Sequence, residues 1–494
     1  MALDDLLHLV QKNIPYASRA DLQLISDAYQ LAALGHAGQK RHSGEDYIVH
    51  PLAVATKLTE MKADVTTVIA GLLHDIPENS AITLEEIEQS FGEEVAKLVD
   101  GVTKLGILKY RGLERYTENL RKMFVAMAED IRVIIIRFAD RIHNLQTLQW
   151  QRPDKRSRIA LESIEIYAAI AHRLGMWQIK GELEDLAFPF AYPKEYQWTL
   201  SLAENKLKVQ EKYLEKIKQI VQKELISQKI QFHSISVRKK HLYSLYKKLV
   251  KKDGDVDAIY DIIALRIVVE NVPDCYKILG IIHQLWTPLK GRIKDYIAQP
   301  KANGYQSLHT TVFCEAGNVV EFQIRDQQME QISEYGIAAH WLYKETSQGK
   351  SKIDKNRLVW LKALKELKNS PQADQDFLEQ IKSDLIKNRI LVFTPKGDVI
   401  DLPEGATPID FAYRVHSDLG NSCQGAIIND QIVSLDTTLK SGDVVSILSN
   451  KTKKMPSLDW LQIVKTYHAK EKIRDALKKE QGNFVSRLLR NKKN

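Results

Sequence analysis

The chain has 494 residues, several times the usual length of one domain, so we expect about three independent hydrophobic cores. Its hydrophobic content of 44% and charged content of 27% are those of an ordinary soluble protein, and no stretch approaches the ~20 apolar residues of a membrane span. Cys275, Cys314 and Cys423 form no C-x-x-C pair, which argues against a disulfide framework and a structural zinc site. We therefore expect a cytoplasmic multidomain protein, and the net charge of +8 predicts phosphate-bearing partners.

Helical periodicity dominates the first part of the chain. Apolar residues recur at spacings of three and four up to about residue 190, so residues 1–195 are predicted to form an all-α domain. A long helix rich in Lys and Glu follows the Pro-aromatic break FPFAYPKEYQW. We interpret residues 196–230 as a helical spacer.

Strand-like runs begin after this spacer. They alternate with helical segments between residues 231 and 345, which predicts a mixed α/β domain with strands at 264–269, 309–313 and 319–325. The polar stretch that follows predicts a linker and a helix over 346–387. Short strands with Gly and Pro turns predict a small β-rich domain over 388–449, and a helical region over 450–494.

Two histidines and two aspartates are spread over three predicted helices of the first domain. His50 opens one helix, His74 and Asp75 follow the apolar run VIAGLL, and Asp140 lies in FADRIHNLQT. Imidazole and carboxylate ligands suit a divalent ion such as Mn²⁺ with open positions for water. Each histidine alone would more often be a hydrogen-bonded core residue, but their joint occurrence on separate helices indicates a metal site.

Two acidic residues stand at predicted strands of the α/β domain. In VVEFQIR, Glu321, Gln323 and Arg325 alternate with apolar residues, which predicts a half-buried strand with its polar groups on one side. Asp261 just precedes the run ALRIVV and could share a cation with Glu321 if the two strands are adjacent. The alternative interpretation is a solvated polar face. The sequence has neither a P-loop nor a strand-borne G-x-G-x-x-G motif.

Four segments of the helical domain resemble the hydrolase half of the RelA/SpoT homologue family. They are RHSGEDYIVHP (41–51), LLHDIPENS (72–80), FGEEVAKLVDGVTKL (91–105) and FADRIHNLQT (138–147). The resemblance implies an HD-type metal-phosphohydrolase domain that cleaves (p)ppGpp to GDP or GTP and diphosphate. It assigns the Mn²⁺ ligands to His50, His74, Asp75 and Asp140, and the nucleotide pocket to Arg41, Asn144 and Thr147.

The chain departs from this family where a Glu-Asp pair organises the attacking water, because it has Glu78-Asn79 there. An amide cannot accept a proton, and losing a general acid or base costs ~10²–10⁴-fold in rate. Pro77 disfavours helical backbone at Ile76 and is expected to re-aim Glu78. We therefore expect a metal-loaded site, with Glu78 and Asn79 at its catalytic position and with weakened hydrolysis.

The α/β domain resembles the family's nucleotidyltransferase-like synthetase domain. The matching segments are RKKHLYSLYKK (238–248), YDIIALR (260–266), GRIKDYI (291–297), PKANGYQSLHTT (300–311), VEFQIR (320–325) and EYGIAAHW (334–341). The resemblance implies transfer of diphosphate from ATP to the 3′-hydroxyl of GDP or GTP, giving AMP and (p)ppGpp, the signal of the stringent response. The segment RIKD (292–295) is of the type found in bifunctional members.

The resemblance also implies roles for individual residues of this domain. Asp261 and Glu321 would hold Mg²⁺, with Glu321 placed to take the 3′-hydroxyl proton. Tyr305 would stack on guanine. The implied substrate-binding positions are Arg238, Lys240, Lys248, Arg266, Lys294, Lys301, Asn303, Tyr305, His309 and Gln323.

The β-rich segment resembles a TGS domain of β-grasp-like fold through VFTPKG, PIDFAYRVH and GDVVSI. In the long relatives this domain contacts tRNA on the ribosome through a histidine at the position of His416, although a lone histidine is more often a surface or capping residue. The chain ends before the C-terminal regulatory domains of those relatives, so we expect limited tRNA or ribosome contact and no membrane contact.

Three hypotheses for function stay open at this point. The first is a bifunctional alarmone enzyme, and the second is a synthetase whose HD domain only senses nucleotides. The third is a catalytically quiet regulator that binds tRNA or the ribosome. Docking alone needs no set of phosphate-chemistry residues such as Asp261, Lys294, Tyr305 and Glu321, which favours the first two.

Overall fold

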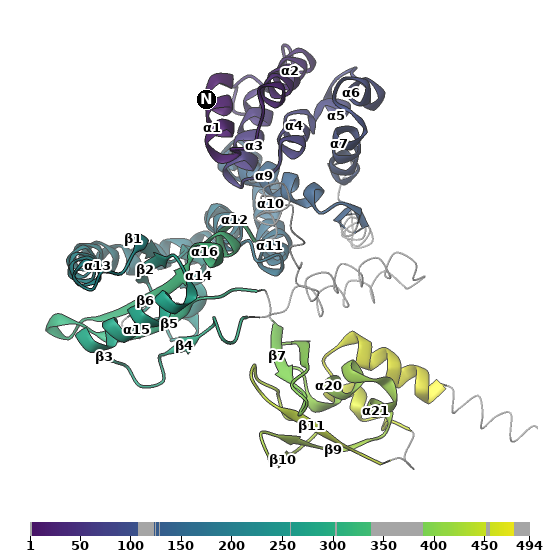
Figure 1. Ribbon diagram of the computed structural model, residues 1–494. Helices are drawn as coiled ribbons and strands as arrows, with labels where there is room; N and C mark the ends of the chain where they lie inside the picture. The colour runs from purple at the N-terminus through teal and green to yellow at the C-terminus, as the bar shows by residue number, and fades with distance from the viewer. Residues whose placement is uncertain are drawn as a thin grey trace, which may run out of the picture. The chain divides into compact units, whose positions relative to one another are not determined.

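The computed structural model describes residues 2–106, 123, 125–127, 129–256, 258–301, 304–336, 389–450 and 455–478. The chain divides into two compact units, Met1–Pro371 and Gln372–Asn494, whose helices and strands are labelled in Figure 1. Among the described helices, none combines the length and the apolar surface that a membrane crossing requires.

The first unit opens with a helical domain, as the periodicity predicted. Local sequence signals begin several helices: Ser18 and Asp21 form a reciprocal capping box, and Asp64 accepts a hydrogen bond from the Thr67 amide at 2.7 Å. The helices are α1 (Leu3–Asn13), α2 (Arg19–Gly35), α3 (Val49–Glu60), α4 (Val65–Leu73), α5 (Ile76–Asn79), α6 (Leu84–Phe91), α7 (Glu93–Gly106), α9 (Arg132–Gln146), α10 (Pro153–Glu162), α11 (Ala168–Arg173) and α12 (Trp177–Ala191), with short helical turns at Leu148–Trp150 and Ser163–Tyr167.

Helix α9 lies inside this domain. Residues 133–136 are all buried, and the helix packs against α3, α4, α7 and α12. A helix with little solvent-facing surface must find partners for its polar side chains within the domain. Asp140 and His143 of α9 are such buried polar residues, and they lie where α3 and the end of α4 also meet.

The second part of the first unit is a mixed sheet with helices packed against it. Its strands follow the order β1-β2-β6-β5-β3, with β4 also paired to β5, and β2 runs parallel to β6 while the other pairs are antiparallel. The elements are α13 (Pro193–Ser227), β1 (Phe232–Lys239), α14 (Leu242–Val250), β2 (Ile263–Val269), α15 (Val272–Leu285), β3 (Thr287–Pro288), β4 (Lys294–Asp295), β5 (Leu308–Phe313), a turn at Glu315–Gly317, β6 (Val319–Asp326) and α16 (Gln327–Tyr335).

Helix α13 is more than a spacer. Its residues Leu214, Ile217 and Val221 are buried in the same hydrophobic core as Leu265 of β2 and Phe322 of β6. The regular apolar spacing on a highly charged helix therefore marks a face that packs on the sheet. Lys212, Glu215 and Lys216, which lie near these buried positions in sequence, are exposed.

Helix α12 joins the helical domain to the sheet. Asp185 accepts a hydrogen bond from the backbone amide of Tyr243 at 3.0 Å, and its other oxygen lies 2.8 Å from Nδ1 of His241. Glu184 is buried between Lys180 at 2.6 Å and Lys247 at 2.8 Å. Buried charges of this kind are tolerated because they are paired, so the junction is a specific contact.

The second unit has two small sheets. The strands are β7 (Arg389–Phe393), β8 (Val399–Pro403), β9 (Cys423–Ile428), β10 (Gln431–Val433) and β11 (Val445–Ser449), and the helices are α20 (Pro408–Val415), α21 (Ser417–Asn421) and α22 (Trp460–Ile463). Strands β7 and β8 pair with each other, and β9 lies between β10 and β11. Buried Asp410 accepts hydrogen bonds from the backbone amide and the hydroxyl of Thr466 at 2.8 and 2.7 Å, so the segment after residue 455 is part of this unit.

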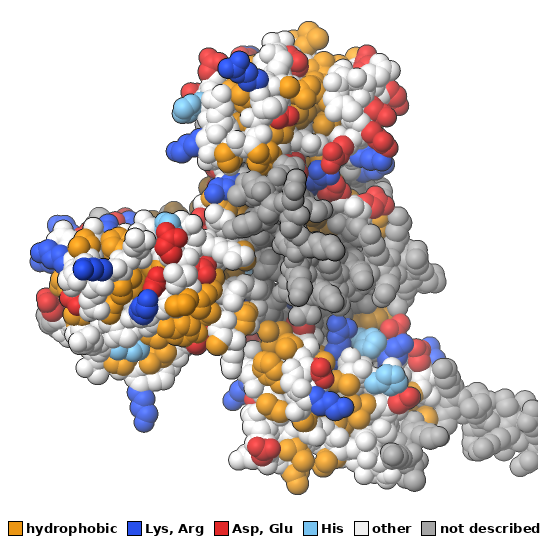
Figure 2. Space-filling model, viewed as in Figure 1, with side chains coloured by type: hydrophobic (Ala, Val, Ile, Leu, Met, Phe, Trp, Pro, Cys, Tyr) orange, Lys and Arg blue, Asp and Glu red, His pale blue; other side chains and the backbone are white. Residues whose placement is uncertain are grey.

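Charged side chains do not by themselves locate a site. On the face drawn in Figure 2, Lys and Arg side chains lie among Asp and Glu side chains over the described surface. The excess of basic residues behind the net charge of +8 therefore forms no purely basic surface on this face. Sites for phosphate chemistry must be found from individual contacts.

Candidate active sites

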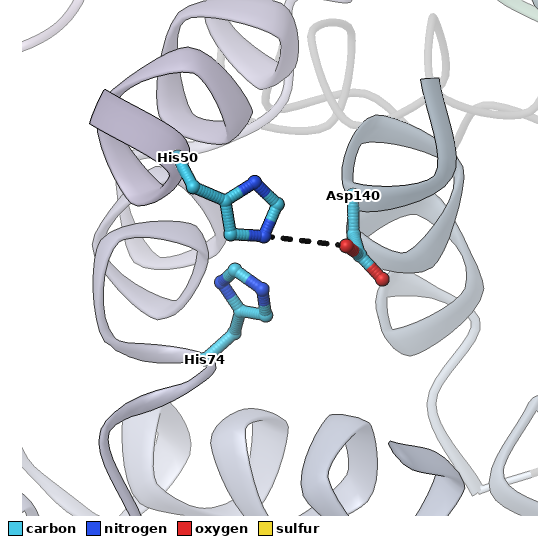
Figure 3. A group of neighbouring side chains, drawn as sticks. All are labelled: His50, His74 and Asp140. Atoms are coloured by element: carbon cyan, nitrogen blue, oxygen red, sulfur yellow. Dashed lines mark ion pairs between the residues drawn. The ribbon is translucent and has the colours of Figure 1, made fainter. Parts of the chain in front are cut away.

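Three predicted ligands meet inside the helical domain. His50 near the start of α3, His74 after α4 and Asp140 of α9 are all buried, and each offers a ligand atom within 4.8 Å of the others. Figure 3 shows the two imidazoles and the carboxylate facing one another from three separate elements. Nε2 of His50 lies 3.4 Å from Oδ1 of Asp140. The predicted convergence of these residues is confirmed.

Asp75 borders the same cluster. One of its oxygens lies 3.1 Å from Nε2 of His74, and the other lies 3.4 Å from Nε2 of His50. The hydroxyl of Tyr47 donates a hydrogen bond to Asp75 at 2.9 Å. The cluster therefore has two imidazoles and two carboxylates, which is the donor set predicted from the sequence.

Surrounding residues orient these side chains. Arg137 and Asn144 donate hydrogen bonds to the two oxygens of Asp140 at 2.9 and 2.5 Å. Nδ1 of His74 lies 2.9 Å from the carbonyl oxygen of Gly71, and Nδ1 of His50 lies 2.8 Å from Nδ1 of His143. Such contacts fix the rotamers of ligand side chains, as outer partners do in metal sites.

Electrostatics hold the cluster in a metal-binding protonation state. Burial lowers the pKa of His50, so its imidazole is neutral. Burial opposes ionisation of Asp140, but Arg137 and then His50 outweigh it and hold the pKa of this carboxyl far below its usual range. Nε2 of His74 is buried and makes no hydrogen bond within the described part of the chain. A neutral His50 imidazole beside the ionised carboxylates of Asp75 and Asp140 fits a divalent cation.

The predicted nucleotide pocket of this domain also forms one group. Arg41 donates to Oδ1 of Asn144 at 3.0 Å and to the hydroxyl of Thr147 at 3.4 Å. Asn144 links this group to Asp140, since its amide nitrogen donates to that carboxylate. Asp140, Asn144 and Thr147 therefore share one side of α9 and its C-terminus, as their spacing predicted.

Glu78 and Asn79 lie at the edge of the cluster in α5. Partial burial, and after it the charge of Asp75, raise the pKa of Glu78. The amide nitrogen of Asn79 lies 3.5 Å from the hydroxyl of Tyr47, which itself bonds Asp75. The expectation that Pro77 disfavours helix at Ile76 is wrong, because α5 begins at Ile76 and Pro77 lies in its first turn, where a proline N–H is not needed.

A second group of predicted residues meets at the sheet. Strands β2 and β6 are adjacent and parallel, with Ala264 opposite Glu321, so Asp261 stands three residues before the partner of Glu321. The adjacency on which the shared-cation hypothesis depended is confirmed. Asp261 bonds Lys240 at 2.6 Å and also Lys248. Burial opposes its ionisation, but these lysines hold the pKa of Asp261 well below its usual range.

Glu321 lies in a chain of hydrogen bonds. Its Oε1 is 3.2 Å from Nδ1 of His309 and accepts a bond from the amide of Gln323 at 3.0 Å. The other ring nitrogen of His309 lies 2.8 Å from the hydroxyl of Tyr305. Burial lowers the pKa of His309, and a neutral imidazole satisfies both neighbours by donating to Glu321 and accepting from Tyr305.

Tyr305 is half-buried among aromatic and basic side chains. Nζ of Lys301 lies 4.9 Å from the centre of its ring, and the guanidinium carbon of Arg325 lies 5.9 Å from it. Burial, and after it the charge of Lys294, lower the pKa of Lys301 to about 8. The charge of Arg238 acts in the same direction, so these cations form one basic region.

The remaining predicted positions differ in placement. Lys294 is exposed in β4, opposite His309 of β5. Arg266 bonds Glu330 at 2.7 Å and Glu334 at 3.1 Å, so its guanidinium is engaged by α16. Asn303 lies outside the described residues. In the second unit, exposed His416 accepts a hydrogen bond from the backbone amide of Asp418 at 3.2 Å and caps α21.

Sequence reasoning missed several residues at both sites. Tyr47, Arg137 and His143 contact the His-Asp cluster, and Trp177 and Tyr296 contact Tyr305 or Lys301. His143 carried one signal, because it stands three residues after Asp140 on the same helix. Trp177 carried none, since Tyr305 lies more than 100 positions away in sequence.

The structure combines a helical domain that holds a buried His-Asp cluster with a mixed α/β domain in which basic and aromatic side chains surround two carboxylates. Three family models match the chain: an HD domain over residues 28–177, the region found in RelA / SpoT proteins over 237–348, and a TGS domain over 390–449.

Curated relatives match nearly the whole chain. The guanosine-3′,5′-bis(diphosphate) 3′-pyrophosphohydrolase of Aquifex aeolicus is 48% identical over 92% of this chain and 65% of its own length. The GTP pyrophosphokinase of Streptomyces coelicolor is 45% identical over 97% and 58%. The bifunctional (p)ppGpp synthase/hydrolase SpoT of Escherichia coli is 44% identical over 96% and 67%.

The chain belongs to the RelA/SpoT family. It spans about 60% to two thirds of the length of these three relatives.

Proposed function

We propose that the chain both makes and degrades (p)ppGpp in the stringent response. The observation that supports the proposal most is the parallel pairing of β2 and β6 with Ala264 opposite Glu321, since Asp261 lies just before β2. Burial opposes ionisation of Glu321, but the contacts of its carboxylate with His309 and Gln323 outweigh burial and hold its pKa below the ordinary value. Two carboxylates among basic side chains suit phosphoryl transfer.

In the proposed synthesis, the 3′-hydroxyl oxygen of GDP or GTP bonds to the β-phosphorus of ATP. The bond from that phosphorus to the α,β-bridging oxygen breaks, AMP leaves, and the hydroxyl proton passes to Glu321. Mg²⁺ held by Asp261 and Glu321 would neutralise phosphate charge. Tyr305 stacks on guanine, and the proposed phosphate- and nucleotide-binding residues are Arg238, Lys240, Lys248, Arg266, Lys294, Lys301, Asn303, His309 and Gln323.

A direct assay tests this reaction. The purified chain with ATP, GDP and Mg²⁺ should yield AMP and ppGpp in equal amounts, and Glu321→Gln should lower the rate by ~10³-fold or more because the proton acceptor is lost. The exposed Lys396→Gln variant in the second unit serves as a control. If the wild-type chain yields neither product under conditions in which a related synthetase is active, the proposal fails.

The helical domain is proposed to hydrolyse (p)ppGpp. Water bonds to the phosphorus attached to the 3′ oxygen, the bond from that phosphorus to the 3′ oxygen breaks, and diphosphate leaves GDP or GTP. Mn²⁺ held by His50, His74, Asp75 and Asp140 would lower the pKa of the bound water. Glu78 takes a proton, which fits its raised pKa, while Arg41, Asn144 and Thr147 hold the nucleotide.

Diphosphate release from ppGpp with Mn²⁺ tests this second activity. His74→Ala should abolish it, because the ligand set loses a buried imidazole. Calorimetry of Mn²⁺ binding should show the same loss in the absence of nucleotide. Binding of ppGpp without turnover would instead favour a nucleotide-sensing HD domain.

Contact with tRNA is proposed for the second unit. Its support is the match to a TGS domain and the exposure of the His416 side chain. Binding of deacylated tRNA to the chain, and its weakening in His416→Ala, would support this role. The exposed Lys440→Gln variant controls for general charge effects.

A further inference from the structure

Three aromatic rings surround the ammonium group of Lys301. Its Nζ lies 4.5 Å from the centre of the Tyr296 ring, 4.9 Å from that of Tyr305 and 5.6 Å from that of Trp177. Cation–π attraction holds the ammonium group in place, while burial lowers its pKa to about 8.

One of these rings comes from the helical domain. Trp177 is the first residue of α12, and its ring centre lies 5.8 Å from that of Tyr305 at an interplanar angle of 66°. His172 of α11 also contacts the indole, with ring centres 4.7 Å apart in an edge-on arrangement. The indole therefore contacts both His172 and the ring that is proposed to stack on guanine.

Polar groups near Tyr305 lack hydrogen-bond partners. The indole Nε1 of Trp177 is buried and makes no hydrogen bond to any described residue. The same holds for Oε1 of Gln323 and Nη1 of Arg325, and Arg325 lies over the Tyr305 ring. Leaving such groups unpaired is unfavourable, and ligand polar groups commonly satisfy them.

We propose that Trp177 forms one wall of the guanine pocket of the synthetase and donates its indole N–H to an acceptor atom of the base. This inference rests on the proposed synthetase activity and extends it to a residue of the helical domain. Guanine offers two acceptors on one edge, O6 and N7, which match an indole donor. The purine replaces the ammonium group among the three rings, and Lys301 turns to the phosphates.

Substitution of Trp177 separates this role from a structural one. Trp177→Leu should raise KM for GDP roughly 10-fold while KM for ATP changes less than about twofold, because both an aromatic wall and a donor are lost. Trp177→Phe should show a smaller rise, about threefold, since the wall remains. Trp150→Leu, at a tryptophan that is 56% exposed, should leave both constants unchanged.

Tryptophan fluorescence provides a readout that does not depend on turnover. GDP added without ATP should change the emission of the wild type, and Trp177→Phe should lose that change while Trp150→Phe keeps it. The inference is overturned if Trp177→Phe responds to GDP like the wild type, or if KM for ATP rises in parallel with KM for GDP. If the wild-type chain makes no ppGpp but shows the expected fluorescence changes, the proposed synthetase activity is wrong and the role of Trp177 in binding GDP stands.

Discussion

The hydroxyl of Tyr305 lies 2.8 Å from Nε2 of His309, whose Nδ1 lies 3.2 Å from Oε1 of Glu321. One imidazole thus connects the ring proposed to stack on guanine with the carboxylate proposed to take the 3′-hydroxyl proton. A shift of the Tyr305 ring on binding a base would therefore change the position of the Glu321 carboxylate through His309. Gln323 holds the same oxygen of Glu321 from the strand itself.

The first prediction concerns His309. His309→Ala removes the group that orients both Tyr305 and Glu321, so kcat for ppGpp synthesis should fall about 10- to 100-fold. His309→Gln should recover part of the loss, because an amide can still donate to Glu321. Steady-state assays with ATP and GDP measure kcat for both variants. His233→Gln, at an exposed histidine of β1, is the control, and wild-type kcat in His309→Ala would contradict the role.

The second prediction concerns Asn79. Asn79→Asp places a carboxylate beside the Tyr47 hydroxyl, so diphosphate release from ppGpp with Mn²⁺ should rise about 10-fold or more. Asn79→Ala removes the amide without adding a proton acceptor and should give no gain. An unchanged rate in Asn79→Asp would show that Glu78 alone supports the reaction.

Much of this architecture could be predicted from local patterns. The helices of the first domain and the strands β2, β5 and β6 could be predicted from the spacing of apolar residues, because helices and strands repeat at different intervals along the chain. Pairing of β2 with β6 could not be predicted in this way, because it joins residues more than 50 positions apart. The Asp261 and Glu321 hypothesis therefore needed either the resemblance or the structure.

Burial of polar groups was the other limit of sequence reasoning. Alternation in β6 predicted a half-buried strand, yet Gln323 and Arg325 on its polar side are 2% and 1% exposed. A period of two reveals that two faces differ but not what covers the polar one. Tyr305 and helix α16 supply contacts to Arg325 there, so the solvated-face alternative is wrong.

The third prediction concerns the dependence of stability on pH. Burial, and after it the charge of Lys180, lower the pKa of His172 to about 4. Its unfolded pKa is about 6.5, so folding favours the neutral form, and this contribution is complete above pH 6.5 and lost as pH falls toward 4. Between pH 7 and pH 5 the loss amounts to about 2 kcal/mol.

Urea unfolding at these two pH values measures this effect. His172→Gln cannot take up the proton, so the free energy of unfolding of the first unit should fall by about 2 kcal/mol less than in the wild type. His8→Gln, at an exposed position of α1, should behave like the wild type. Equal losses in His172→Gln and the wild type would show that another group controls acid sensitivity.

The fourth prediction compares two helical glycines. A Cβ on Gly181 of α12 would lie 2.1 to 2.4 Å from ring atoms of His241, whose Nδ1 lies 2.8 Å from Asp185. The ring cannot withdraw without losing that partner, so Gly181→Ala should lower the free energy of unfolding by about 1–3 kcal/mol. A Cβ on Gly280 of α15 would meet no atom within 4 Å, so Gly280→Ala should be neutral or stabilising by up to about 1 kcal/mol.

Denaturant unfolding of the two variants measures the difference. The double variant Gly181→Ala with His241→Ala should recover most of the stability lost in Gly181→Ala, because the clashing ring is gone, although the bond to Asp185 is lost as well. Equal stability of the Gly181→Ala and Gly280→Ala variants would mean that α12 and the loop before α14 are not in close contact in solution. Since Trp177 begins the same helix, a loose α12 would also weaken its contact with Tyr305, and KM for GDP should then rise in Gly181→Ala.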